Sequence, residues 1–243
     1  MVDDLFLLGL RALGYAPRLL LAPPGPLGAD CRALVTLLDV AMIGCVMQHR
    51  EANGSVLSFI ARLTAPVTLA RCPAAAADVL RAHLLPRAPV FVRLLLSCIA
   101  GTLPPGRVGI VSAALIGVVA FGATGPFASA GTDIASSQGL GWLTDALRAV
   151  PEVAATSSDK QAFLGAATAA LRTGPVASGT GEGDMMGNGE GGGFYDDSGW
   201  EAACQEFADL CRRNKRARQA AQAALLPQEL AAAVDNGERR RGR

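Results

Sequence analysis

The sequence is poor in aromatic and charged residues, which make up 5% and 18% of its 243 residues, whereas 51% are hydrophobic. Little charge combined with much apolar content excludes intrinsic disorder for the chain as a whole. β-Branched residues other than Val are also sparse, while Leu and Ala are abundant, and this composition favours helix over sheet. We therefore expect an all-α protein with a sizeable core.

The sequence also lacks the patterns of metal, disulfide and secretory proteins. Its histidines, His49 and His83, lie 34 residues apart, and none of its six cysteines forms a CxxC pair. A zinc site needs closely spaced ligands, so we expect no metal and no cofactor, and free buried thiols in a reducing compartment. The acidic start, Met1 to Asp4, is unlike the basic start of a secretory signal.

No catalytic constellation is evident either. The chain has no G-x-S-x-G element, no triad order and no pair of carboxyl groups within an apolar helix. His49, Arg50 and Glu51 form a charged group, but they lie between two expected helices. There Glu51 would favour the next helix N-terminus, and Arg50 could bond the last carbonyls of the preceding helix. We expect a structural corner here, and a binding protein instead of an enzyme.

Helical periodicity runs through nearly the whole chain. Asp30 is expected to cap a helix that continues to about Met47, and Asn53 or Ser55 to cap the next one. Further helices are expected at 74–85, 89–101, 107–121, 138–149 and 159–172. Short turns between helices of this length are typical of paired-helix solenoids, although periodicity alone fits a compact bundle equally well.

One stretch, 108–132, has 25 consecutive residues without charge and is long enough to cross a bilayer. Gly122, Gly125 and Pro126 interrupt it, however, and only Arg107 supplies a basic flank. A helix buried among other helices explains the stretch as well as a membrane span does.

The C-terminal part changes composition twice. Residues 174–199 are rich in glycine and acids and are expected to be a flexible linker, without the GxxxxGK[ST] pattern of a phosphate loop. A final helical part, 200–235, carries a basic cluster of candidate partner contacts, and 236–243 is expected to be a disordered basic tail. The basic cluster consists of Arg212, Arg213, Lys215, Arg216 and Arg218. It lacks neighbouring aromatic residues to stack bases, so no direct nucleic-acid binding is expected.

The block 49–59, HREANGSVLSF, resembles one near the C-terminal end of the transportin-SR and importin-thirteen branch of importin-β nuclear transport receptors. The matching positions are His49, Arg50, Glu51, Asn53, Ser55 and Phe59. Residues 2–21, the helix, Pro-Pro turn and helix at 90–118, the WL-x-x-AL-x-x-VP pattern at 142–151, and EFADLCRRNK at 206–215 resemble the family in the same order.

The resemblance implies a HEAT-like α-α superhelix of antiparallel helix pairs over 1–173. It also implies a nuclear import receptor that shuttles between cytoplasm and nucleus and binds protein cargo such as Arg/Ser-rich splicing factors. Nucleoporins are further candidate partners, and Ran would bind only through repeats that this chain lacks. Two alternatives remain at this point: a membrane protein with a span near 108–127, and a free-standing helical adaptor whose basic tail binds an acidic partner.

Overall fold

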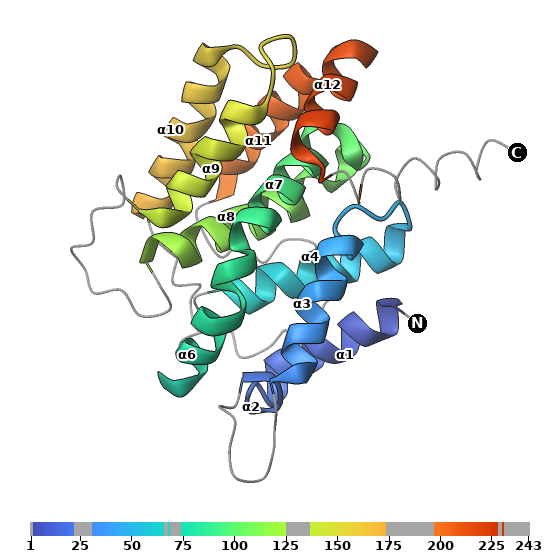
Figure 1. The fold of residues 1–243 in the computed structure, drawn as a ribbon, viewed down its shortest axis with the longest axis vertical. Helices are drawn as coiled ribbons and strands as arrows, with labels where there is room; N and C mark the ends of the chain where they lie inside the picture. Colours follow the sequence, from blue (N-terminus) through green and yellow to red (C-terminus); the bar gives the residue numbers. More distant parts are fainter. Residues whose placement is uncertain are drawn as a thin grey trace, which may run out of the picture.

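The computed structural model describes residues 2–21, 31–65, 68, 74–124, 137–173, 197–227 and 230 (Figure 1). These residues form helices and turns, with no strand among them. The expectation of an all-α fold is therefore confirmed. The expected cap at Asp30, most of the linker 174–199 and the tail 236–243 lie outside the described residues, and the expected division into domains stays a prediction.

The N-terminal part contains α1 (Val2–Tyr15), α2 (Arg18–Leu21), α3 (Arg32–Gly44) and α4 (Arg50–Thr64). Helix α1 packs along α4, where the rings of Phe6 and Phe59 meet edge to face with centroids 5.4 Å apart. Helix α3 ends at Gly44, one turn earlier than the expected Met47. At this end α3 lies close to α4, because a Cβ on Gly44 would lie 2.7 Å from a methyl group of Val56.

The central part contains α6 (Ala74–His83), a 3-10 turn η1 (Leu85–Arg87), α7 (Ala88–Ser97) and α8 (Val108–Thr124). A turn of π-helix, η2 (Cys98–Thr102), and a 3-10 turn, η3 (Pro105–Arg107), connect α7 to α8. The π turn ends through Gly101, whose φ of 123° lies in the left-handed region that favours glycine.

The C-terminal part contains α9 (Gln138–Ala149), α10 (Ser157–Thr173), α11 (Asp197–Arg212) and α12 (Lys215–Leu225). The structure divides the expected helical part 200–235 into two helices at Arg213 and Asn214. Asn214 has an extended backbone, and its side-chain oxygen accepts a hydrogen bond from the Ala217 backbone N–H at 2.8 Å. Asn214 is therefore the N-cap of a separate helix.

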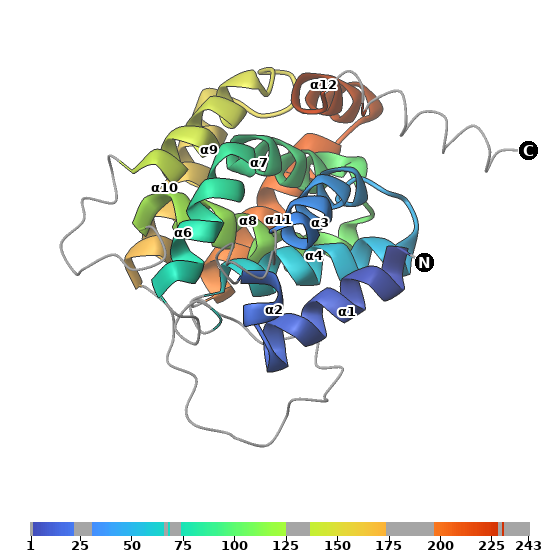
Figure 2. The same cartoon turned by 60° about the horizontal axis from the view of Figure 1, so that its bottom comes forward.

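The helices stack in two layers (Figures 1 and 2). In one layer α1 contacts α4, α4 contacts α8, and α8 contacts α11; in the other α3 contacts α7, and α7 contacts α12. The pairs α3 with α4, α7 with α8, and α12 with α11 join the layers, while α9 packs on α7 and α8, and α10 on α11. This arrangement agrees with the expected HEAT-like solenoid.

Two helical stretches, Ala75–Thr102 and Pro105–Ala123, are long and apolar enough to cross a membrane. In the fold, the most apolar 18 residues of these two stretches are 61% and 67% buried within the protein. Helix α8 contacts α4, α7, α9 and α11, and Leu115, Ile116 and Val119 are fully buried. The uncharged stretch therefore lies between neighbouring helices over 108–121, as the solenoid interpretation requires.

Candidate functional site: the motif corner and the basic cluster

The motif corner, residues 44–59, is the turn between α3 and α4 together with the first part of α4. His49 is the N-cap of α4, in place of the expected Asn53 or Ser55, and its ring Nδ1 accepts a hydrogen bond from the Ala52 N–H at 3.4 Å. His49, Arg50 and Glu51 are exposed at the start of the helix. Glu51 lies in the first turn, where a negative charge is favourable.

Asn53 connects the two helices of the corner. Its side-chain amide donates to the carbonyl oxygens of Gly44 at 3.1 Å and of Cys45 at 2.8 Å, and the residue is 2% exposed. Asn53 therefore satisfies the carbonyls at the end of α3, a role that the sequence suggested for Arg50. The Arg50 side chain is exposed instead, and its backbone carbonyl accepts a hydrogen bond from Arg107 at 2.7 Å.

Ser55 and Phe59 attach α1 to the corner. The Ser55 hydroxyl donates to the carboxylate of Asp3 and contacts the Glu51 carbonyl oxygen at 3.0 Å. Phe59 is fully buried against Phe6. The motif residues thus divide into an exposed charged start and a buried part that fixes the packing of α1, α3 and α4.

We expect Asn53→Ala to lower the free energy of unfolding by about 2 kcal/mol, because the change removes two buried hydrogen bonds that join α4 to the end of α3. Urea denaturation followed by circular dichroism measures this loss. The matched control is Ser58→Ala in the same helix, expected within about 0.5 kcal/mol of wild type. An unchanged stability of Asn53→Ala would show that the corner does not depend on this amide.

Arg212 differs from the expected partner contact, because its guanidinium group points into the fold. Its Nε donates to the Ile99 carbonyl oxygen at 3.1 Å, and one terminal nitrogen donates to the carbonyl oxygens of Cys98 at 3.1 Å and Leu103 at 3.0 Å. Burial lowers the pKa of this guanidinium, while the charge of Asp209 acts in the opposite direction. Arg212 is thus a structural residue that ties α11 to the π turn η2.

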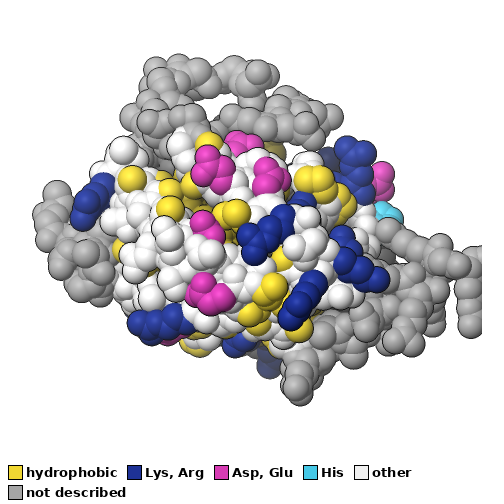
Figure 3. Space-filling view, turned by 90° about the horizontal axis from the view of Figure 1, so that it is seen from above, with side chains coloured by type: hydrophobic (Ala, Val, Ile, Leu, Met, Phe, Trp, Pro, Cys, Tyr) yellow, Lys and Arg dark blue, Asp and Glu magenta, His cyan; other side chains and the backbone are white. Residues whose placement is uncertain are grey.

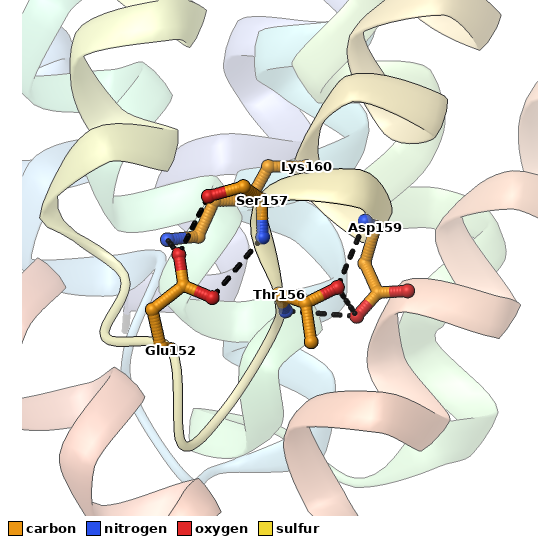
Figure 4. Close-up of polar contacts among 5 residues, drawn as sticks. All are labelled: Glu152, Thr156, Ser157, Asp159 and Lys160. Atoms are coloured by element: carbon orange, nitrogen blue, oxygen red, sulfur yellow. Dashed lines mark hydrogen bonds and ion pairs between the residues drawn. The ribbon is translucent and has the colours of Figure 1, made fainter.

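Arg213 is exposed but also makes a contact within the chain. One of its terminal nitrogens donates to the Val153 carbonyl oxygen at 2.7 Å, in the connection between α9 and α10. Next to that contact, hydrogen bonds join Thr156 and Asp159 at the start of α10 (Figure 4). The Thr156 backbone N–H donates to the Asp159 carboxylate, and the Asp159 backbone N–H donates to the Thr156 hydroxyl oxygen. Hydrogen bonds from Thr156 lower the pKa of Asp159.

A second polar group shares this turn. The Ser157 hydroxyl donates to Glu152 at 2.8 Å, and the Lys160 ammonium lies 3.3 Å from the same carboxylate oxygen (Figure 4). The hydrogen bond from Ser157 is the main cause of the lowered pKa of Glu152. Both carboxyl groups are solvent-exposed and cap the helix, so this cluster has the geometry of a helix start and not of an acid–base pair.

The other members of the basic cluster, Lys215, Arg216 and Arg218, are exposed in the first turn of α12. The stem of Arg218 packs close to Gly101, where an added Cβ would lie 2.8 Å from its Cγ. The structure thus leaves these three charges at the surface and holds Arg212 inside. On the face that Figure 3 shows, basic and acidic side chains are interspersed, and no single charge predominates.

Three of the cysteines near these contacts are buried thiols. Burial raises the pKa of Cys98 and Cys211 to about 12, and that of Cys45 well above its usual range. At neutral pH these thiols stay protonated and are poor nucleophiles. Within the described part of the chain, no group of three or more His, Cys, Asp or Glu side chains is placed to hold a metal ion.

Several structural residues were not identified from the sequence. Arg107 extends from η3 to α4, where it lies over Gly54. Trp200 of α11 is 2% exposed and donates from its indole N–H to the Ser112 carbonyl oxygen in α8 at 2.9 Å. A lone Trp after a glycine-rich stretch, and an Arg directly before an apolar run, are the sequence signals that could have indicated such anchors.

The chain is similar to a known transportin over most of its length. The chain is 29% identical over 230 residues to Transportin MOS14 of Arabidopsis thaliana. That match covers 94% of this chain and 19% of the relative, so the chain spans about one fifth of the length of this transportin. No protein-family model and no solved structure matches the chain. The resemblance to transportin-type receptors of the importin-β family is confirmed.

Proposed function

We propose that this chain is a solenoid part of a nuclear import receptor and binds protein cargo, such as Arg/Ser-rich splicing factors. The similarity to Transportin MOS14 over 94% of the chain carries this proposal. A receptor of this kind would shuttle between cytoplasm and nucleus. Nucleoporins, as the proteins of the pore, are further candidate partners.

The physical character of the chain supports binding over catalysis. Asn53, Ser55 and Arg212, the polar residues at the centre of the two candidate sites, all make bonds within the fold. Residues 1–211 contain 13 basic and 18 acidic residues, an acidic excess that favours basic cargo. Stacked helix pairs also supply the extended surface that protein ligands need.

We expect this chain to bind an Arg/Ser-rich protein without releasing it in response to RanGTP. Release by a second ligand requires two sites joined by one deformable element, and the resemblance implies that Ran is bound by repeats outside the part of the receptor that this chain matches. The test is a pull-down of an Arg/Ser-rich protein by the purified chain, with and without RanGTP. A Lys/Ser-rich protein of equal charge is the matched control for purely electrostatic attraction.

Each outcome of the pull-down separates the alternatives. Equal capture of both cargoes would contradict recognition of Arg/Ser segments, and no capture of either would contradict cargo binding. Release on addition of RanGTP would overturn the assignment of Ran to repeats outside the matched part of the receptor. If the chain purified only with detergent, the membrane alternative would replace the receptor.

A further inference from the structure

Four exposed cations lie where α11 ends and α12 begins, and we call them the α12 patch: Arg213, Lys215, Arg216 and Arg218. In the described part of the chain, no carboxylate forms an ion pair with any of them. Other arginines have acidic partners at 2.6 to 3.0 Å: Arg81 with Asp78, Arg87 with Asp39, and Arg148 with Asp145. The α12 patch is therefore a local excess of positive charge on a chain whose formal net charge is +1.

The α12 patch is electrostatically unfavourable for the fold itself. No acidic residue lies in the first turn of α12, where the partial positive charge of the helix N-terminus favours acids and disfavours cations. Burial is the main cause of the lowered pKa of Arg212, and the like charge of Arg218 acts in the same direction. Charged groups that a fold holds at a cost are typical of functional surfaces.

Two of the patch side chains are held in place by the fold beneath them. The stem of Arg218 packs against the π turn at Gly101, and Arg213 donates to the Val153 carbonyl oxygen at 2.7 Å. Asn214 fixes the start of α12 as its N-cap. Because stems are packed while charged ends are exposed, a ligand here has to order fewer side chains than on a freely mobile surface.

The surroundings of the patch indicate what kind of ligand it fits. Single-stranded nucleic acid is bound by cations together with aromatic side chains that stack on the bases, and α12 contains no aromatic residue. A membrane-surface helix exposes large apolar side chains that enter the lipid. None of the large hydrophobic side chains exposed in the described residues lies in α11 or α12. Recognition here is by charge, and a run of Asp and Glu side chains is complementary to it.

We propose that the α12 patch binds an acidic segment of a partner protein, whose Asp and Glu side chains pair with the four cations. An extended peptide advances roughly 3.3 to 3.6 Å per residue, and one turn of helix rises about 5.4 Å, so a few successive acids span the patch. This ligand is opposite in charge to the Arg/Ser-rich cargo proposed above. The inference therefore does not depend on the cargo-binding function.

Fluorescence anisotropy of a labelled peptide of about ten glutamates, titrated with the full chain, tests the proposal. We expect binding that weakens as the salt concentration rises, and no binding of a glutamine peptide of the same length. Arg216→Glu should raise the dissociation constant for the glutamate peptide at least fivefold. Arg172→Glu is the matched control, because it makes the same change of charge at the exposed far end of α10, a helix about 25 Å long whose start lies beside Arg213.

Urea denaturation separates a lost contact from a damaged fold. A negative charge is favourable at the start of a helix, so Arg216→Glu should be as stable as the wild type or more stable, although it binds the glutamate peptide more weakly. Capture of an Arg/Ser-rich protein by Arg216→Glu should be unchanged or greater, because the added acid attracts a basic cargo. Failure of the cargo proposal would therefore leave this result as it is.

Three results would overturn the proposal. The first is no binding of the glutamate peptide even at low salt. The second is equal binding by the wild type and Arg216→Glu, or equal weakening by Arg172→Glu, because the overall charge of the chain would then explain the attraction. The third is tighter binding of a single-stranded oligothymidine of equal charge, which would replace the acidic protein segment by a nucleic acid.

Discussion

The variant Gly139→Ala is expected to lose about 3 kcal/mol or more of unfolding free energy, the largest loss that we predict. Gly139 lies at the start of α9, where this helix crosses α8. A Cβ at this position would overlap the carbonyl oxygen of Val119 and lie 2.9 Å from its carbonyl carbon and 3.1 Å from the Ala123 nitrogen. These are backbone atoms of a buried helix, so they cannot rotate away as a side chain could.

The matched control is Gly141→Ala, two residues further along the same helix. Nothing lies within 4 Å of a Cβ at Gly141. At an exposed helical position Ala is more favourable than Gly by up to about 1 kcal/mol, so this variant should be slightly more stable than the wild type. Urea denaturation of both variants gives the comparison, and equal stabilities would contradict the close approach of α8 and α9.

The second large effect is expected at Arg212, where Arg212→Ala should cost about 3 kcal/mol. The change removes the charge-assisted hydrogen bonds from Arg212 to the carbonyl oxygens of Cys98, Ile99 and Leu103, in and after the π turn. Thermal unfolding together with proteolysis of the C-terminal helices would show whether α11 separates from η2.

Two neighbouring variants define what the guanidinium contributes. Arg212→Lys keeps the charge but not the forked geometry, so we expect an intermediate loss. Arg213→Ala removes an exposed bond to Val153 and should cost less than about 1 kcal/mol. If Arg212→Lys were as stable as the wild type, charge alone would explain the role of Arg212.

The helices could be predicted from the sequence because the apolar positions recur at helical spacing and the turns carry Pro, Gly or capping residues. Residues 138–149, for example, were predicted to the residue, since Ser137 supplies an N-cap whose hydroxyl accepts from Leu140. The break at 213–214 was missed, because Arg and Lys are good helix formers and the capping role of Asn214 depends on one backbone conformation.

The candidate sites were harder to predict than the helices. The pattern of the motif corner indicated a structural turn, but not that Asn53 would reach back to α3 while Arg50 stayed exposed. Arg212 and Arg213 are adjacent in sequence and identical in type, yet one lies inside and the other at the surface. The carbonyl oxygens of Cys98, Ile99 and Leu103 hold the Arg212 side chain inside the fold. These residues lie more than 100 positions away, so the local spacing of apolar residues around Arg212 does not reveal them.

The contact between α8 and α11 also affects how the protein folds during translation. Trp200 covers α8 at Ser112, 88 residues earlier in the chain. At translation rates of about 5 to 20 residues per second, Trp200 is added to the chain roughly 4 to 18 seconds after Ser112. During that interval the face of α8 that α11 covers in the finished fold is open to solvent and to molecular chaperones.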